Sequence, residues 1–119
     1  AKSIVFRSGA RPVLAIASGV NRVDPAKVAA ALGRDVAAAD GRWVREISGF
    51  AIGGVAPLGH LTPPLVLVDR DLFAFDTVWA AAGSPNHVFR TDPDSLLRLS
   101  GGAPADIAGR SATADPPAP

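Results

Sequence analysis

The apolar runs of this chain are short, and this feature constrains the fold most. The clearest are Val13 to Ala17, Leu65 to Val68 and Val78 to Ala82, which end at Ser, Asp and Gly respectively. Four or five residues suit a β-strand, and a run without polar alternation is typical of a strand buried on both faces. A membrane-spanning helix needs ~20 apolar residues. The chain therefore favours a sheet joined by turns.

Composition further limits the class of protein and the kinds of site that the chain can form. With 119 residues, 48% of them hydrophobic and 19% charged, the chain can build one domain with a core. Cys is absent, which excludes a disulfide framework, a thiolate nucleophile and Cys-ligated zinc or iron–sulfur sites. This fits our expectation of a cytoplasmic protein. A net charge of +1 excludes a global basic field, so any nucleic-acid contact must be local.

Turn and capping residues divide the rest of the chain into elements. Three helices are expected, each ending at a Gly, namely 25–32, 41–48 and 93–100. Asp24 and Asp40 are the expected N-caps of the first two, and Thr91 or Asp92 that of the third. Strands are expected over 3–7, 13–17, 36–39, 65–68, 78–82 and 87–90, the first two forming a hairpin. We predict a mixed α/β fold, with a mixed, largely antiparallel central sheet or barrel-like sheet and flanking helices.

The two ends of the chain differ from this pattern. Residues 109–119 are Ser, Ala, Asp and Pro in the main, so we predict a domain over 1–108 and a disordered tail over 109–119. Ile4 lies inside a strand pattern almost at the first residue, and the chain holds no Met. We therefore expect that an N-terminal piece is missing.

Lys2 is the first candidate for chemistry. The chain has only two lysines, and Lys2 opens a strand, where its ammonium can point into a cleft and bind a phosphate, a carboxylate or a developing oxyanion. The commoner alternative is a solvated lysine at a strand end.

The loop from Gly53 to Pro57 is the second candidate. Its adjacent glycines, Gly53 and Gly54, let a backbone approach a ligand closely, and inward-facing N–H groups can hold a carbonyl oxygen as negative charge develops. Pro57 would stiffen the loop. The alternative is a plain glycine turn.

Histidines and tryptophans give weaker signals. Ser84 and His87 could line a pocket, but a nucleophile–base pair there has no elbow motif and no third member. His60 is expected at the surface, and Trp43 and Trp79 in the core. No carboxylate stands at ligand spacing from either His, so we predict no metal site and no cofactor.

Several motifs, taken in order, resemble one family. Lys2 to Arg7 is similar to the lysine-bearing strand of the YbaK/ProX aminoacyl-tRNA deacylases, which are relatives of the editing domain inserted in bacterial prolyl-tRNA synthetases. Gly49 to Gly59 is similar to the family's most specific motif, and Trp79 to Ser84 and Asp94 to Gly101 match its closing strand and helix. Ala56 departs from the pattern, because many members have Ser there.

The resemblance implies a hydrolase for the ester of mischarged tRNA, acting in trans, with tRNA(Pro) carrying Ala, Ser or Cys as substrate. The partners would be the tRNA acceptor end and prolyl-tRNA synthetase, with no membrane. The residues implied in catalysis are Lys2, Gly53, Gly54 and Val55, and those implied in substrate binding are Ala56, Pro57, Ala82, Gly83, Ser84 and His87. The alternative is a module of the same fold that binds an aminoacyl end, an amino acid or a nucleotide without turning it over.

Overall fold

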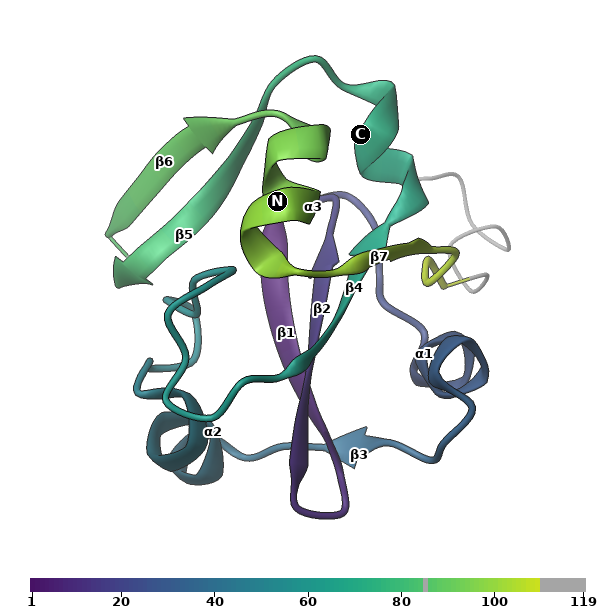
Figure 1. Ribbon diagram of the computed structural model, residues 1–119, viewed down its shortest axis with the longest axis vertical. Helices are drawn as coiled ribbons and strands as arrows, with labels where there is room; N and C mark the ends of the chain where they lie inside the picture. The colour runs from purple at the N-terminus through teal and green to yellow at the C-terminus, as the bar shows by residue number, and fades with distance from the viewer. Residues whose placement is uncertain (85, 110–119) are drawn as a thin grey trace.

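A five-stranded sheet organises the molecule, and a two-stranded ribbon stands beside it (Figure 1). The computed structural model describes residues 1–84 and 86–109. The sheet has the order β3-β1-β2-β4-β7, with β1 (Lys2–Ser8), β2 (Arg11–Ala17), β3 (Ala37–Ala38), β4 (Leu65–Asp69) and β7 (Ala103–Ala105). The ribbon pairs β5 (Val78–Ser84) with β6 (His87–Thr91). The mixed α/β class is confirmed.

Strand directions in the central sheet are evenly divided. β1 runs antiparallel to β2 and to β3, whereas β2 and β4, and β4 and β7, are parallel. We predicted a largely antiparallel sheet. The difference arises because the chain crosses over through two helices between β2 and β4, and through the ribbon and a third helix between β4 and β7. Such crossovers return the chain in its original direction.

The three helices begin and end where the capping residues predict. They are α1 (Pro25–Leu32), α2 (Gly41–Ser48) and α3 (Pro93–Ser100), and a short 3₁₀ helix, η1 (Arg70–Ala74), follows β4. The N-cap carboxylates of Asp24, Asp40 and Asp92 accept hydrogen bonds from backbone N–H groups in the first turns. In α1, Val28 is buried and Ala31 is exposed.

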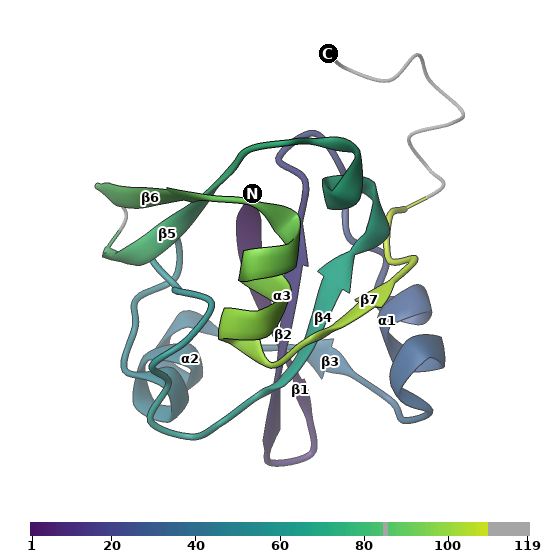
Figure 2. The same cartoon turned by 45° about the horizontal axis from the view of Figure 1, so that its top comes forward.

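Two apolar clusters fill the two sides of the sheet. On β2, Val13 and Ala15 pack with Val28 of α1, while Leu14 and Ile16 pack on the other side with Val44, Leu96 and their neighbours. Figure 2 shows α1 apart from α2 and α3 across the sheet. Because both faces of β2 and β4 are covered by these clusters, both sets of alternate side chains in these strands are apolar, which accounts for their unbroken apolar runs.

The predictions for the ribbon and for Trp79 are wrong. We expected Val78 to Ala82 to form a central strand with Trp79 in the core, but β5 pairs only with β6 and Trp79 is 52% exposed. Alternate residues Val78 and Ala80 are buried. Alanine is found on both buried and exposed faces of strands, so the three alanines after Trp79 gave no sign that buried and exposed residues alternate here. Trp43 is half-buried, and Arg7 lies 4.5 Å from its ring centroid.

β7 was not predicted, and Gly102 explains how it reaches the sheet. A Cβ at that position would lie 2.8 Å from Cγ1 of Val66, so only glycine permits this approach. Within residues 1–84 and 86–109, none of the helices has both the length and the apolar character needed to cross a membrane. Of the predicted tail, residues 110–119 lie outside the described residues.

Candidate active site

One cavity gathers most of the catalytic residues that the sequence singled out. It has a volume of about 180 Å³ and lies where the start of β1, the loop after α2 and the β5–β6 ribbon meet. Its lining residues are Ala1, Lys2, Ser3, Gly53, Val55, Ala81, Ser84 and Val88. Strand pairing with Ala17 holds Lys2 at the end of the hairpin, so the sheet fixes the backbone of the lysine.

The two lysines have different surroundings. Lys27 donates to both carboxylate oxygens of Asp106, at 3.1 and 3.2 Å. Lys2 has no carboxylate within salt-bridge distance among the described residues. Its ammonium can therefore meet an anionic group of a ligand without first leaving a protein partner.

The glycine loop offers two of the three expected backbone donors. The Gly54 N–H donates to the carbonyl of Ala51 at 2.9 Å, so it is engaged within the loop. In the part of the chain that the structure describes, the N–H groups of Gly53 and Val55 have no hydrogen-bond partner. Gly53 has a φ of 89°, a conformation open to glycine because it has no Cβ.

His60 anchors this loop, contrary to the expected surface position. Its Nε2 lies 2.7 Å from the carbonyl oxygen of Ala56, and because a carbonyl only accepts, Nε2 carries the hydrogen. Nδ1 is buried and has no partner among the described residues. The Phe50 ring packs edge-on against the imidazole, with centroids 5.1 Å apart. A histidine directly after a glycine loop was the only sequence signal for this role.

Ser84 and His87 are in contact across the end of the ribbon. Ser84 Oγ and His87 Nδ1 are 2.6 Å apart, and the Asn86 N–H donates to the same Oγ at 3.3 Å. No carboxylate of the described residues bonds to the imidazole, so the pair has no third member in that part of the chain. Ser84 lines the cavity, while His87 is exposed.

The other predicted binding residues are more distant from this cavity. Ala56 and Pro57 are buried in the glycine loop and Ala82 is exposed, and none of the three lines the cavity. Gly83 packs close to Phe50, since a Cβ there would lie 3.4 Å from the ring. Ala56 therefore contributes no group to the cavity wall.

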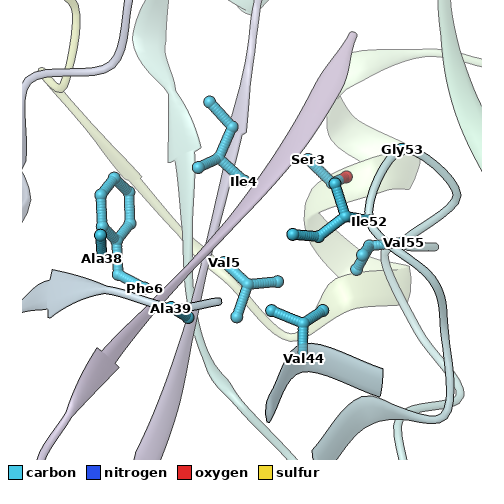
Figure 3. Close-up of a pocket in the computed structure, with 10 residues that line it drawn as sticks. All are labelled: Ser3, Ile4, Val5, Phe6, Ala38, Ala39, Val44, Ile52, Gly53 and Val55. Carbon is cyan, nitrogen blue, oxygen red and sulfur yellow. The ribbon is translucent and has the colours of Figure 1, made fainter. Parts of the chain in front are cut away.

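A second, apolar pocket adjoins the cavity (Figure 3). Its volume is about 220 Å³, and it shares Ser3, Gly53 and Val55 with the cavity. The remaining lining is apolar and comes from β1, β3, α2 and the loop, namely Ile4, Val5, Phe6, Ala38, Ala39, Val44 and Ile52. A ligand with a polar head in the cavity could extend a small apolar group into this pocket.

The cavity groups suit an anionic or carbonyl oxygen. They comprise the Lys2 ammonium, two backbone N–H groups and the hydroxyls of Ser3 and Ser84, and such donors can stabilise charge that develops on an oxygen. The described residues contain no cluster of three or more His, Asp or Glu side chains placed to hold a metal ion.

The fold and this cavity define a mixed α/β domain with a cavity lined by hydrogen-bond donors at the end of a hairpin. Comparison with protein families identifies the family. Residues 1–99 match the model of the aminoacyl-tRNA editing domain. The chain belongs to this family, which is of the YbaK type, as the lysine strand and the glycine loop indicated.

Individual relatives agree with the family match. The chain is 35% identical over 101 residues to the uncharacterized protein YwhH of Bacillus subtilis (strain 168), and it spans 64% of that protein's length. It is 42% identical, with a TM-score of 0.86, to a crystal structure of a protein proposed to be a trans-editing enzyme for prolyl-tRNA synthetase; the match covers 91% of this chain and 69% of that one. A scaffold protein used to present grafted epitopes matches with 40% identity and a TM-score of 0.86, over 91% of this chain and 70% of its own.

Proposed function

We propose that the protein is a deacylase that hydrolyses the ester between an amino acid and the 3′ end of a mischarged tRNA, acting in trans. The observation that carries this proposal is the meeting of Lys2, Gly53 and Val55 around one cavity. Membership of the editing family supports it, as does the similarity to a protein proposed to edit for prolyl-tRNA synthetase.

The chain's own groups suggest how the reaction proceeds. Lys2 holds the terminal phosphate or adenosine and orients the ester. A water oxygen attacks the carbonyl carbon, and the N–H groups of Gly53 and Val55 stabilise the resulting oxyanion. Loss of one such donor lowers kcat by about 10²–10³-fold. The attacking water loses its proton to the substrate's amine or a ribose hydroxyl. Collapse of the intermediate breaks the ester C–O bond, and the released ribose oxygen takes up a proton.

The pocket beside the cavity sets which amino acid is accepted. Small side chains such as those of Ala, Ser and Cys fit the apolar recess, and larger ones are excluded by size. We expect Ala and Cys to be favoured over Ser, since Ser3 is the one hydroxyl residue among the described residues that line this pocket. A hydrophobic pocket discriminates by only ~1–3 kcal/mol per methylene, so exclusion by size is the stronger rule. The proposed substrate is tRNA(Pro), the partner is prolyl-tRNA synthetase, and the setting is the cytoplasm.

The alternative function is a module that binds an aminoacyl-tRNA end, an amino acid or a nucleotide without hydrolysis. The observation in its favour is the lack of an oriented protein base, because His87 bonds to no carboxylate of the described residues. Such a module would keep the cavity and the lysine. It predicts that loss of Lys2 weakens binding, with no turnover to lose.

Hydrolysis of defined substrates tests the proposal. The protein is incubated with tRNA(Pro) charged separately with Ala, Ser, Cys and Pro, and loss of the labelled amino acid is followed. We expect selective release from a mischarged tRNA, reduced by about 100-fold or more in Lys2→Ala. Lys27→Ala is the matched control, and it removes a surface ion pair worth at most ~1 kcal/mol of stability. Hydrolysis that is equal in both variants, or absent from all four tRNAs, would refute the proposal.

A further inference from the structure

One face of the β5–β6 ribbon presents an exposed tryptophan beside an arginine. Trp79 pairs with Arg90 in the register of the ribbon, and Ala81 pairs with Val88. Residues two apart on a strand share a face, so these four side chains lie on one side of the ribbon. Val78 and Ala80 on the other side are buried. Figures 1 and 2 show the ribbon beside the main sheet.

This face continues into the cavity. Ala81 and Val88 line the cavity together with Lys2. Trp79 and Arg90 form the next cross-strand pair on the same face. Two residues along a strand span about 7 Å, so this pair lies about 7 Å from Ala81 and Val88. Trp79 also lines another pocket, separate from the two already described, of about 160 Å³. Phe75, which is 49% exposed, lines it too. A surface with an aromatic ring and a cation therefore leads directly away from the cavity.

We propose that Trp79 and Arg90 bind the single-stranded 3′ end of the tRNA next to the aminoacylated nucleotide. Trp79 stacks on a base, and Arg90 pairs with a backbone phosphate. This inference rests on the proposed function, which places the terminal nucleotide in the cavity. It adds the site for the nucleotides that precede it, and it explains how a chain of net charge +1 holds RNA locally.

Chemistry and position favour this occupant over a protein partner. Every base has a flat face that stacks on an aromatic ring, whatever the sequence, and Arg guanidinium groups pair with phosphates in a forked geometry. Lys2 supplies a second cation at the cavity end of the same surface. An RNA strand whose end occupies the cavity must leave it along some wall, and this wall carries both kinds of contact.

Tryptophan fluorescence reports on the stacking directly, since the chain has only two tryptophans. Trp43→Phe leaves Trp79 as the sole emitter. We expect a short RNA that ends in CCA, and uncharged tRNA, to quench this variant on titration. Trp79→Phe is the matched control. It leaves only Trp43, which is half-buried beside Arg7, and we expect no quenching. Quenching that is absent from Trp43→Phe, or equal in the two variants, would overturn the proposal.

Affinities for the same RNA test each contact, measured with a label on the RNA. Trp79→Ala should weaken binding about 5- to 100-fold, the range for one lost base–aromatic stack, and Trp79→Phe should recover part of it. Arg90→Gln should lower the slope of log affinity against log salt by about 0.7, the value for one phosphate contact on a single strand. Arg11→Gln, an exposed change at the far end of the hairpin, should alter neither. Unchanged affinity in Trp79→Ala and an unchanged slope in Arg90→Gln would refute the site.

Deacylation assays separate this proposal from the one on which it rests. If the RNA quenches Trp79 but no aminoacyl-tRNA is hydrolysed, the binding site is supported and the deacylase function fails. If hydrolysis is present and Trp79→Ala has the KM and kcat of the unchanged protein, the deacylase stands and the Trp79–Arg90 site is wrong. We expect a raised KM, with kcat largely kept.

Discussion

The polar groups on the α1 side of the molecule differ from those around the cavity. Near α1, Lys27 is paired with Asp106, and Arg34 donates to Ser8 Oγ at 2.9 Å. At the end of β4, the buried carboxylate of Asp69 accepts from Asn21 Nδ2 at 2.9 Å and from the Asp71 N–H at 3.0 Å. Each of these groups has its partner within the protein.

Around the cavity, several donors have no such partner among the described residues. They are the Lys2 ammonium and the N–H groups of Gly53 and Val55. Gly53 is exposed, Lys2 half-buried and Val55 buried, and none of these donors is committed to a protein acceptor among the described residues, so a ligand in the cavity could supply one. The comparison separates groups that stabilise the fold from groups that we propose act on a substrate.

The largest effect is expected at Gly53. Its φ of 89° is strained for any residue with a Cβ, so Gly53→Ala should move the loop and misplace both proposed donors. We expect kcat for deacylation to fall about 10²–10³-fold, as for the loss of an oxyanion donor. Gly9→Ala, at a φ of 59° in the hairpin turn, introduces comparable strain away from the cavity. It should cost ~1–2 kcal/mol of stability and leave kcat unchanged. Equal kcat in the two variants would contradict the assignment of the loop.

Asp69 tests the other side of the comparison. The residue is 1% exposed, so Asp69→Ala leaves the Asp71 N–H without its acceptor and leaves the Asn21 amide with Asp71 as its one remaining carboxylate partner among the described residues. We expect the free energy of unfolding in urea to fall by about 2–4 kcal/mol. Activity per folded molecule should be retained. A variant of full stability would show that the network does not stabilise the fold.

His60 lies between the two groups, since it bonds within the protein like the first and holds the loop of the second. His60→Ala removes the donor to Ala56, and we expect kcat to fall roughly tenfold, less than the ~10²-fold that a 1 Å misplacement can cost. His60→Gln offers an amide donor of similar reach and should restore most of kcat. In the unchanged protein, ¹⁵N NMR should show the hydrogen on Nε2. A hydrogen on Nδ1 alone would rule out this contact.

The smallest effect is expected at the cap of α3. Hydrogen bonds from the Ser95 N–H and then its hydroxyl lower the pKa of Asp92 below the ordinary carboxyl value. A carboxyl whose folded pKa is depressed contributes stability above its unfolded pKa and loses it as the pH falls through the folded pKa. The stability difference between the protein and Asp92→Asn should therefore shrink on acidification, as thermal unfolding midpoints can measure. A difference that grows at acid pH would contradict this sign.

Local signals allowed the helices and the hairpin to be predicted from the sequence. Asp24, Asp40 and Asp92 cap the helices because a carboxylate one residue before a first turn meets free N–H groups, whatever surrounds it. Lys2 and the glycine loop were also visible, since their residue types restrict what they can do. The prediction of the loop was incomplete, because nothing in the sequence shows that the Gly54 N–H turns to Ala51.

The misplaced elements depend on contacts between distant segments. The run from Val78 to Ala82 looks fully buried, but only the packing decides that one face of β5 meets the core while Trp79 stays exposed. His60 became an anchor because the loop returns the Ala56 carbonyl to it. Neither contact can be read from local residue preference.

The sequence by itself determined the boundaries of the three helices, their glycine ends, the mixed α/β class and the family, because these depend on residues that are neighbours along the chain. Only the tertiary structure decided the parallel pairing of β2 with β4 and the meeting of Lys2 with Gly53 and Ser84 in one cavity. It also decided that Trp79 and Arg90 share a surface with that cavity. The physical reason is that strand order and side-chain burial are set by the whole core, and the favourable free energy of that core is shared among residues far apart in sequence.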